Sequence, residues 1–217
     1  YEESLNSTEH SKVKKEVNVK TKERLVFLIG FPRSGTTLLD TILRSHHQID
    51  VLEEKPLINS VENIIKTKFK LSLSKIHYLK KEDLDYLRKH YLSELHKYRD
   101  PDKKANVFID KYPFQTACLP LINLLFPEAK IIFAHRNPFD TVLSCFQQTF
   151  EPNNAMANFT TLKSSAQIYD LTMQMWVLYK KNLKLDFVMS KYETLLDNFD
   201  NHINNCLLYT SPSPRDS

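Results

Sequence analysis

The octapeptide GFPRSGTT, from Gly30 to Thr37, has residue types and a spacing that could bind a phosphate group. It holds the only 2 glycines of the 217-residue chain, and the hydroxyl residues Thr36 and Thr37 follow the second glycine. Glycine allows a tight backbone turn and close approach of a ligand. Between a strand and a helix, such a loop points several backbone amides and the positive end of the helix at one anion. A glycine turn that only begins a structural helix is the alternative interpretation.

Arg33 supplies a cation within this loop, whereas Thr36 stands where a nucleoside triphosphatase has its phosphate-binding lysine. A guanidinium can bind a phosphate through two parallel hydrogen bonds. A triphosphate with magnesium would require the lysine. The loop therefore favours a 5′ phosphosulfate as its ligand, and no metal is expected.

A second segment, HRNPFDTVLS from His135 to Ser144, repeats this arrangement at another predicted strand end. Asn137 is expected to cap a helix whose first residue is Pro138. Arg136 at the strand tip and Ser144 on the second helical turn could then bind one phosphate. An ordinary helix start with a surface arginine is the alternative.

Short apolar segments predict the strands that position these loops. The expected strands are residues 24–30, 106–110, 130–136 and 186–191, and helices are expected to begin near residues 36, 113, 138, 161 and 193. The segment 53–100 is charged and helical in pattern, with no strand expected, and Trp176 is assigned to the core. Apolar strands that alternate with helices indicate an α/β fold, a parallel β-sheet flanked by helices, with ligands at the carboxyl ends of the strands.

Residues 24–205 are predicted to form one domain that is incomplete at its C-terminus, preceded by a polar linker at residues 1–23. The last twelve residues, 206–217, read CLLYTSPSPRDS and resemble a translated sequencing adapter. We expect them not to be native, although a Ser/Pro-rich tail is the alternative.

Composition limits the classes of partner that the chain could bind and the cellular compartments in which it could lie. The formal net charge is +4, but the lysines are scattered, which disfavours nucleic acid as a partner. No apolar run is long enough to cross a bilayer. Without residues 206–217 the cysteines are Cys118 and Cys145, in no metal or disulfide pattern, which favours a reducing, cytoplasmic location. The pair His46–His47 could bind a metal or act as a base, but is more typical of a helix cap.

The two motifs together resemble the paired 5′-phosphosulfate and 3′-phosphate motifs of sulfotransferases that use 3′-phosphoadenylyl sulfate (PAPS). The segments FPRSGTTLLDTILRSHHQI, VFIDKYPF, LINLLFPEAKIIFAHRNPFDTVLSCF and SKYETLLDN are similar to the catalytic domain of bacterial tetratricopeptide-repeat sulfotransferases, relatives of tyrosylprotein sulfotransferases. The resemblance covers about Leu25 to Asp200. It implies a truncated fold like that of P-loop nucleoside triphosphatases, PAPS as co-substrate and no metal.

The resemblance also implies roles for individual residues. The 5′ phosphosulfate would be bound by Arg33, Ser34, Gly35, Thr36 and Thr37, and the 3′ phosphate by Arg136 and Ser144. Tyr192 would contact the nucleotide. Glu54 matches the proposed general base on the acceptor hydroxyl, and Lys111, like Arg33, would act on the transferring sulfuryl group, where charge develops. The alternatives are that Glu53 and Glu54 form a solvated helix start and that Asp110 and Lys111 form a structural ion pair that caps a strand.

Departures from the family pattern bear on which acceptor the chain would use. His47, Leu52 and Asn137 replace the family's proline, small residue and aspartate at loop positions. Lys55–Pro56 replaces the threonine and arginine that follow the base in animal tyrosylprotein enzymes. The implied acceptor is therefore a hydroxyl compound, with peptide tyrosine, a sugar and a small molecule all open.

The resemblance implies a later C-terminal segment and N-terminal helical repeats that could bind protein, and we expect this sequence to lack both. The chain is thus expected to fold in part and turn over poorly. A P-loop nucleotide phosphotransferase and a noncatalytic nucleotide-binding module remain the alternative functions.

Overall fold

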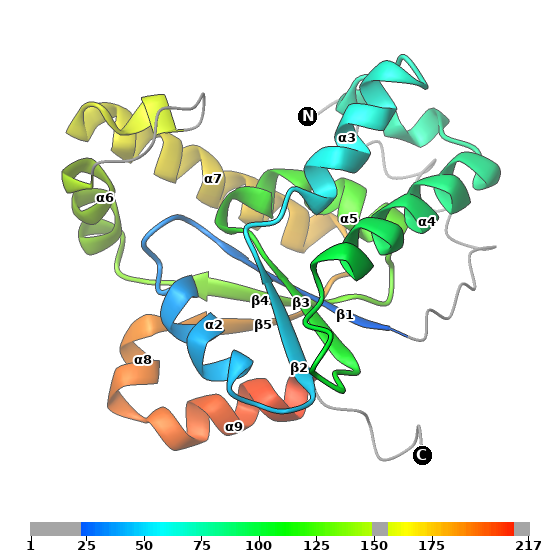
Figure 1. The fold of residues 1–217 in the computed structure, drawn as a ribbon. Helices are drawn as coiled ribbons and strands as arrows, with labels where there is room; N and C mark the ends of the chain where they lie inside the picture. Colours follow the sequence, from blue (N-terminus) through cyan, green and yellow to red (C-terminus); the bar gives the residue numbers. More distant parts are fainter. Residues whose placement is uncertain (1–22, 149–155, 211–217) are drawn as a thin grey trace.

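The computed structural model describes residues 23–148 and 156–210. Within these ranges the chain forms one sheet in which every neighbouring pair of strands is parallel. The strand order is β2-β3-β1-β4-β5, which places β1 at the centre (Figure 1). The strands are β1 (Arg24–Gly30), β2 (Ile49–Glu53), β3 (Val107–Lys111), β4 (Lys130–His135) and β5 (Asp186–Lys191). The predicted α/β fold with a parallel sheet is confirmed.

Helices connect the strands and cover both faces of the sheet (Figure 1). They are α2 (Thr36–Arg44), α3 (Leu57–Thr67), α4 (Lys81–Tyr98), α5 (Leu119–Leu125), α6 (Pro138–Gln147), α7 (Leu162–Asn182), α8 (Tyr192–Asp197) and α9 (Phe199–Thr210), with 3-10 helices at Leu73–Tyr78, Pro113–Cys118 and Met156–Phe159. Among the described helices, none combines the length and the apolar character needed to cross a bilayer.

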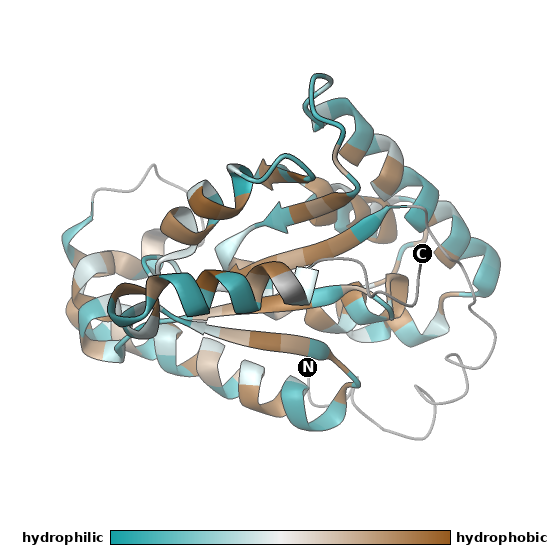
Figure 2. Cartoon of the chain, turned by 90° about the horizontal axis from the view of Figure 1, so that it is seen from below, coloured by the Kyte–Doolittle hydropathy of each residue, from teal (hydrophilic) through white to brown (hydrophobic). Residues whose placement is uncertain are grey.

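Two apolar cores lie on opposite faces of the sheet. The larger core joins one face to α3, α4, α5 and α7, and the smaller core joins the other face to α2, α8 and α9. Hydrophobic residues run along the strands, whereas the helices alternate between hydrophobic and hydrophilic residues (Figure 2). Strands that are covered on both faces must be apolar on both, which explains why RLVFLIG in β1 is buried from Leu25 onwards.

Strand β2 was not predicted. Its sequence, IDVLE, has only 5 residues and includes the buried Asp50, so its pattern is neither a continuous apolar run nor a clean alternation. The structure satisfies Asp50 because its Oδ2 accepts the backbone N–H of Asp100 at 2.8 Å. Beyond Glu53, the predicted helical character up to Asp100 is confirmed by α3, a 3-10 helix and α4.

The predicted start of α6 and the predicted core position of Trp176 are confirmed. Asn137 caps α6, because its side chain accepts the N–H of Phe139, and Pro138 is the first helical residue as expected. Trp176 lies in the larger core and stacks on Phe133 with ring centroids 4.0 Å apart.

The predicted domain end at residue 205 falls within α9, where Cys206 is buried in the smaller core. The non-native origin of residues 206–217 stays a prediction, and residues 1–22, 149–155 and 211–217 lie outside the described ranges.

Candidate functional site

The loop between β1 and α2 has a backbone that only glycine suits at two positions. A Cβ on Gly30 would lie 2.5 Å from the carbonyl oxygen of Ala134 on the neighbouring strand. Gly35 has φ 92°, in the left-handed region, and caps the amino end of α2. A Cβ on Gly35 would also lie 2.5 Å from the ring of Tyr192. The two glycines therefore serve this loop, as the sequence predicted, through close packing as well as conformation.

Two buried polar atoms, one in this loop and one just after β4, make no hydrogen bond to any described residue. They are Ser34 Oγ and Arg136 Nε. Buried polar atoms in proteins are nearly always paired, so an orphaned pair at one edge of a sheet indicates a place for a ligand with acceptor oxygens. A phosphate or sulfate group is such a ligand. The residues present thus fit the phosphate ends of the nucleotide that the resemblance implies.

The two predicted anion-binding motifs meet in space. Arg33 Nε donates to Ser144 Oγ at 3.0 Å, although 111 positions separate them. Arg136 Nη1 lies 3.5 Å from the carbonyl oxygen of Arg33, and its guanidinium sits over the ring of Tyr192, 4.8 Å from the centroid. Asp140 lies 3.9 Å from Arg136 Nη2, a long and exposed contact that offsets the charge of Arg136 only weakly. The carboxyl ends of β1, β4 and β5 therefore form one cationic surface.

The remaining residues of the first motif lie at the start of α2. Thr36 is buried and Thr37 is exposed, so only Thr37 presents its side chain to solvent. His46 and His47 stack on each other beyond the other end of α2, with centroids 4.8 Å apart, and lie away from this loop. The described residues contain no group of three histidines, cysteines or carboxylates that could hold a metal.

The predicted base and the predicted cation are in direct contact at the ends of β2 and β3. Lys111 is fully buried, and its Nζ donates to Glu54 Oε1 at 2.9 Å. The backbone N–H of Glu54 donates to the carbonyl oxygen of Lys111 at 2.8 Å, and Glu54 has φ 49°. This left-handed turn bends the chain at the strand end and keeps the carboxylate beside the ammonium. The side chain of Glu54 is 55% exposed, so it can meet an incoming group.

Glu53 belongs to this site and was not among the predicted residues. Lys111 Nζ also donates to Glu53 Oε1, at 3.0 Å. The hydrogen bond from Lys111 holds the pKa of Glu53 below its ordinary value, against the opposing effect of burial. The signal that could have identified Glu53 is the parallel register that pairs it with Lys111, and that register depends on the unpredicted strand β2.

His135 lies at the end of β4 next to Arg136. Burial lowers the pKa of His135, which favours the neutral imidazole.

The chain is similar to an uncharacterized protein of Aquifex aeolicus (strain VF5), with 29% identity over 151 residues. The aligned part is 63% of this chain and 18% of that protein, so the chain spans less than a fifth of its relative.

Three crystal structures of bacterial sulfotransferases resemble the fold. Sulfotransferase STF1 from Mycobacterium tuberculosis H37Rv matches with a TM-score of 0.54 and 14% identity, over 97% of this chain and 73% of that one. A sulfotransferase from Alicyclobacillus acidocaldarius has a TM-score of 0.53 and 12% identity, over 88% and 82%. STF9 from Mycobacterium avium has a TM-score of 0.52 and 14% identity, over 93% and 67%. At these identities the likeness concerns the fold alone.

The match of the sequence to a family model assigns the family, which the likeness in fold alone does not. The family model described as "Sulfotransferase family" matches residues 26–209, which is most of the chain. That range contains both anion-binding motifs and the Glu54–Lys111 pair. This chain belongs to the sulfotransferase family.

Proposed function

We propose that the chain transfers a sulfuryl group from PAPS to a hydroxyl acceptor. The observation that carries this proposal is the meeting of the two anion-binding motifs, through the hydrogen bond from Arg33 to Ser144 and the contact of Arg136 with the Arg33 carbonyl. A nucleotide with phosphates at both the 5′ and the 3′ position would need two adjacent cationic sites. Family membership supports the same reaction class.

In this proposal the loop binds the 5′ end of the nucleotide. Arg33 and the amides up to Thr37 would contact the 5′ phosphosulfate, and the unpaired Ser34 hydroxyl would gain an acceptor. Arg136, with Ser144, would contact the 3′ phosphate. Tyr192 supports this geometry, because its ring packs against Gly35 on one side of the site and carries the Arg136 guanidinium.

The transfer itself is assigned to the pair at the ends of β2 and β3. When bound, PAPS supplies the sulfuryl group and a phosphate leaving group. Glu54 would accept the proton of the acceptor hydroxyl, since its carboxylate is exposed and fixed at a strand end. Lys111 would donate a hydrogen bond to the oxygen on which negative charge develops. No residue role in this scheme requires a metal.

The acceptor is proposed only as a class. Peptide tyrosine, a sugar and a small hydroxyl compound are the candidates to screen, and Lys55 stands where the peptide-binding enzymes of the family have threonine. We propose a reducing, cytoplasmic location, which is supported by the free thiols of Cys118 and Cys145.

Calorimetric titration tests the donor site. The ligands are adenosine 3′,5′-bisphosphate, adenosine 5′-phosphate and magnesium ATP, and the variants are Arg33→Gln and Arg136→Gln. Each substitution removes charge-assisted hydrogen bonds, so we expect affinity for the bisphosphate to fall about tenfold to a hundredfold. Arg136→Gln should leave affinity for the 5′-phosphate unchanged, because that ligand has no 3′ phosphate.

Arg99→Gln is the matched control, because Arg99 follows α4, precedes β3 and lies over the ring of Phe108. It should bind all three ligands as the unsubstituted chain does. Preference for magnesium ATP over the bisphosphate would overturn the proposal in favour of a phosphotransferase. Tight bisphosphate binding with no sulfate release from PAPS would identify a noncatalytic binding module.

A further inference from the structure

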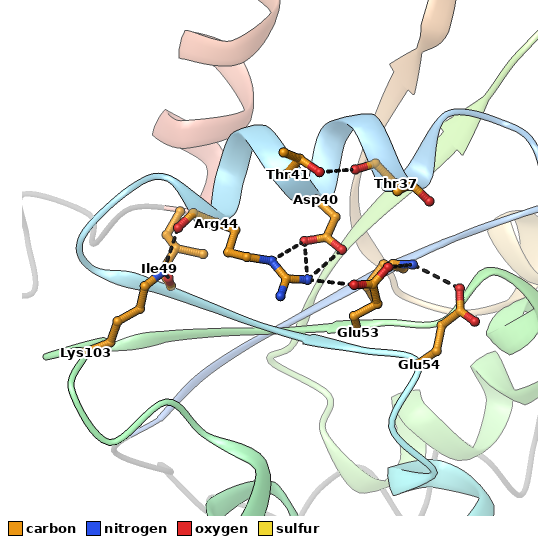
Figure 3. Close-up of polar contacts among 9 residues, drawn as sticks. Thr37, Asp40, Thr41, Arg44, Ile49, Glu53, Glu54 and Lys103 are labelled. Carbon is orange, nitrogen blue, oxygen red and sulfur yellow. Dashed lines mark hydrogen bonds and ion pairs between the residues drawn. The ribbon is translucent and has the colours of Figure 1, made fainter.

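Five side chains of alternating charge connect α2 to the ends of β2 and β3. Figure 3 labels four of them, Asp40, Arg44, Glu53 and Glu54. Arg44 Nη2 lies 2.8 Å from Asp40 Oδ1 and 3.1 Å from Glu53 Oε2. Lys111 Nζ then contacts Glu53 and Glu54 at 3.0 and 2.9 Å. We call these five residues the charge chain. Each of its three inner members lies between two groups of opposite charge.

The two carboxylates that share Lys111 are held differently. Glu53 accepts from Lys111 with Oε1 and from Arg44 with Oε2, so both of its oxygens are fixed. Arg44 is fixed in turn, because its Nε and Nη2 donate to Asp40. Glu54 contacts Lys111 through one oxygen only, although the two side chains are similarly exposed, 55% for Glu54 and 45% for Glu53. Glu54 can therefore turn towards a proton while Glu53 stays in place.

A buried ammonium needs acceptors, because its desolvation is costly when it is unpaired. Lys111 is fully buried, and it would lose one of its two carboxylates whenever Glu54 engages an acceptor. Glu53 then keeps the ammonium paired. The lowered pKa of Glu53, caused first by the hydrogen bond from Lys111, agrees with a carboxylate that stays ionised in this position.

We propose that Glu53, fixed by Arg44 and Asp40, is a positioning residue that holds the Lys111 ammonium in place while Glu54 is released to the acceptor. This inference rests on the proposed sulfuryl transfer. Glu53 acts through Lys111 and touches no reacting atom. Asp40 and Arg44 lie on α2, the helix that follows the loop after β1. The charge chain therefore also fixes Lys111 relative to that loop.

The test compares Glu53→Gln with the unsubstituted chain in four measurements. Hydrogen exchange of the Lys111 ammonium is followed by nitrogen-15 NMR, with the signal assigned by its loss in Lys111→Met. The second measurement is sulfate release from PAPS to water, which needs no known acceptor: water attacks sulfur, the bond from sulfur to the phosphate oxygen breaks, and the bisphosphate leaves. Bisphosphate affinity and thermal stability are the third and fourth.

We expect Glu53→Gln to speed ammonium exchange and to slow sulfate release, each by about tenfold, which is the order expected for loss of one hydrogen bond between charged groups. Bisphosphate affinity should stay within about twofold. Arg44→Gln should shift both measurements in the same direction, and Glu53→Asp should recover part of each loss. Glu94→Gln is the matched control, because Glu94 pairs with the exposed Lys97 on α4.

The outcomes separate this inference from the function on which it rests. A Glu53→Gln variant that keeps both ammonium protection and sulfate release would overturn the positioning role alone. A fall in thermal stability with ammonium exchange unchanged would also overturn it, since that is the behaviour of a purely structural ion pair. Failure of the unsubstituted chain to bind the bisphosphate would overturn the proposed function, and the positioning role with it.

Discussion

At the ends of β2 and β3 the cation Lys111 is held between two carboxylates, whereas at the ends of β1 and β4 the cations Arg33 and Arg136 contact a hydroxyl, a carbonyl and an aromatic ring. Strand β1 contributes only to the group around Arg33 and Arg136. The carboxyl edge of the sheet thus has a paired half, around Lys111, and an unpaired half, around the two arginines.

The difference indicates what each half is built to receive. In the paired half the protein supplies its own counter-charges, so the ammonium is oriented before any ligand arrives. In the unpaired half Arg136 is near two carboxylates, in a long contact with Asp140 at 3.9 Å and under the charge of Glu193, while Ser34 Oγ and Arg136 Nε lack acceptors. An anionic ligand would gain most from the unpaired half. We therefore expect the unpaired half to bind the nucleotide and the paired half to catalyse the transfer. The following substitutions test whether the two roles can be separated.

The largest effect is expected for Lys111→Met, which removes the cation of the paired half. Loss of one stabilising donor at a reacting oxygen lowers rates by about a hundredfold to a thousandfold. Sulfate release from PAPS should fall by this amount, while calorimetry should find bisphosphate affinity nearly unchanged. The control is Lys97→Met, at an exposed lysine on α4. Equal losses of rate and affinity would mean that the two halves are not separable.

The next effect is expected for Gly35→Ala, which strains the unpaired half. A left-handed backbone costs a non-glycine residue about 1–2 kcal/mol, and overpacking adds about 1–3 kcal/mol where the new Cβ meets the ring of Tyr192. Urea unfolding should therefore find a loss of roughly 2–5 kcal/mol in the free energy of unfolding.

The double variant Gly35→Ala with Tyr192→Ala separates these two costs. Its second substitution should relieve the steric part and leave the part due to φ 92°. A single variant as stable as the unsubstituted chain would contradict the assigned close contact.

A pH-dependent effect is expected from Asp110, which precedes Lys111 in the paired half. Burial raises the pKa of Asp110 to about 7, although a hydrogen bond from Tyr91 opposes this. Between the ordinary value of 3.8 and about 7 the native state binds more protons at Asp110 than the unfolded state does. The free energy of unfolding should thus fall as pH rises through that window, by up to about 1.4 kcal/mol per pH unit.

Denaturant unfolding at several pH values checks this dependence. Asp110→Asn should remove the contribution, since asparagine does not titrate, and Asp102→Asn, at an exposed position, should retain it. An Asp110→Asn variant with the full pH dependence would show that other groups cause it.

The smallest effect is expected for Ser144→Ala in the unpaired half. This variant removes one neutral hydroxyl from the proposed 3′-phosphate site, worth about 0.5–1.5 kcal/mol, so bisphosphate affinity should fall about twofold to tenfold. Ser45→Ala is the matched control, because that exposed serine donates only to the Ile42 carbonyl near the end of α2. An effect in the control as large as that in Ser144→Ala would indicate nonspecific destabilisation.

The sequence predicted the unpaired half more completely than the paired half, for a physical reason. Loop motifs such as GFPRSGTT and the Asn137–Pro138 helix start are contiguous, and local backbone chemistry is enough to recognise them. Strand β2 is five residues long with an inward aspartate, so its period could not be recognised. Without β2, Glu53 could not be placed opposite Lys111 from the residue pattern alone.

Sequence alone determined strands β1, β3, β4 and β5, the two glycines of the loop, and the residue types that can bind anions or move a proton. Tertiary structure decided which of them meet. Arg33 and Ser144 are 111 positions apart, and Glu53 and Lys111 are 58 apart, yet each pair forms a hydrogen bond. Parallel strands bring their carboxyl ends to one edge whatever the length of chain between them. Sequence spacing therefore predicts local geometry such as turns and helix starts. The register of the sheet determines which distant residues come together in the charge chain.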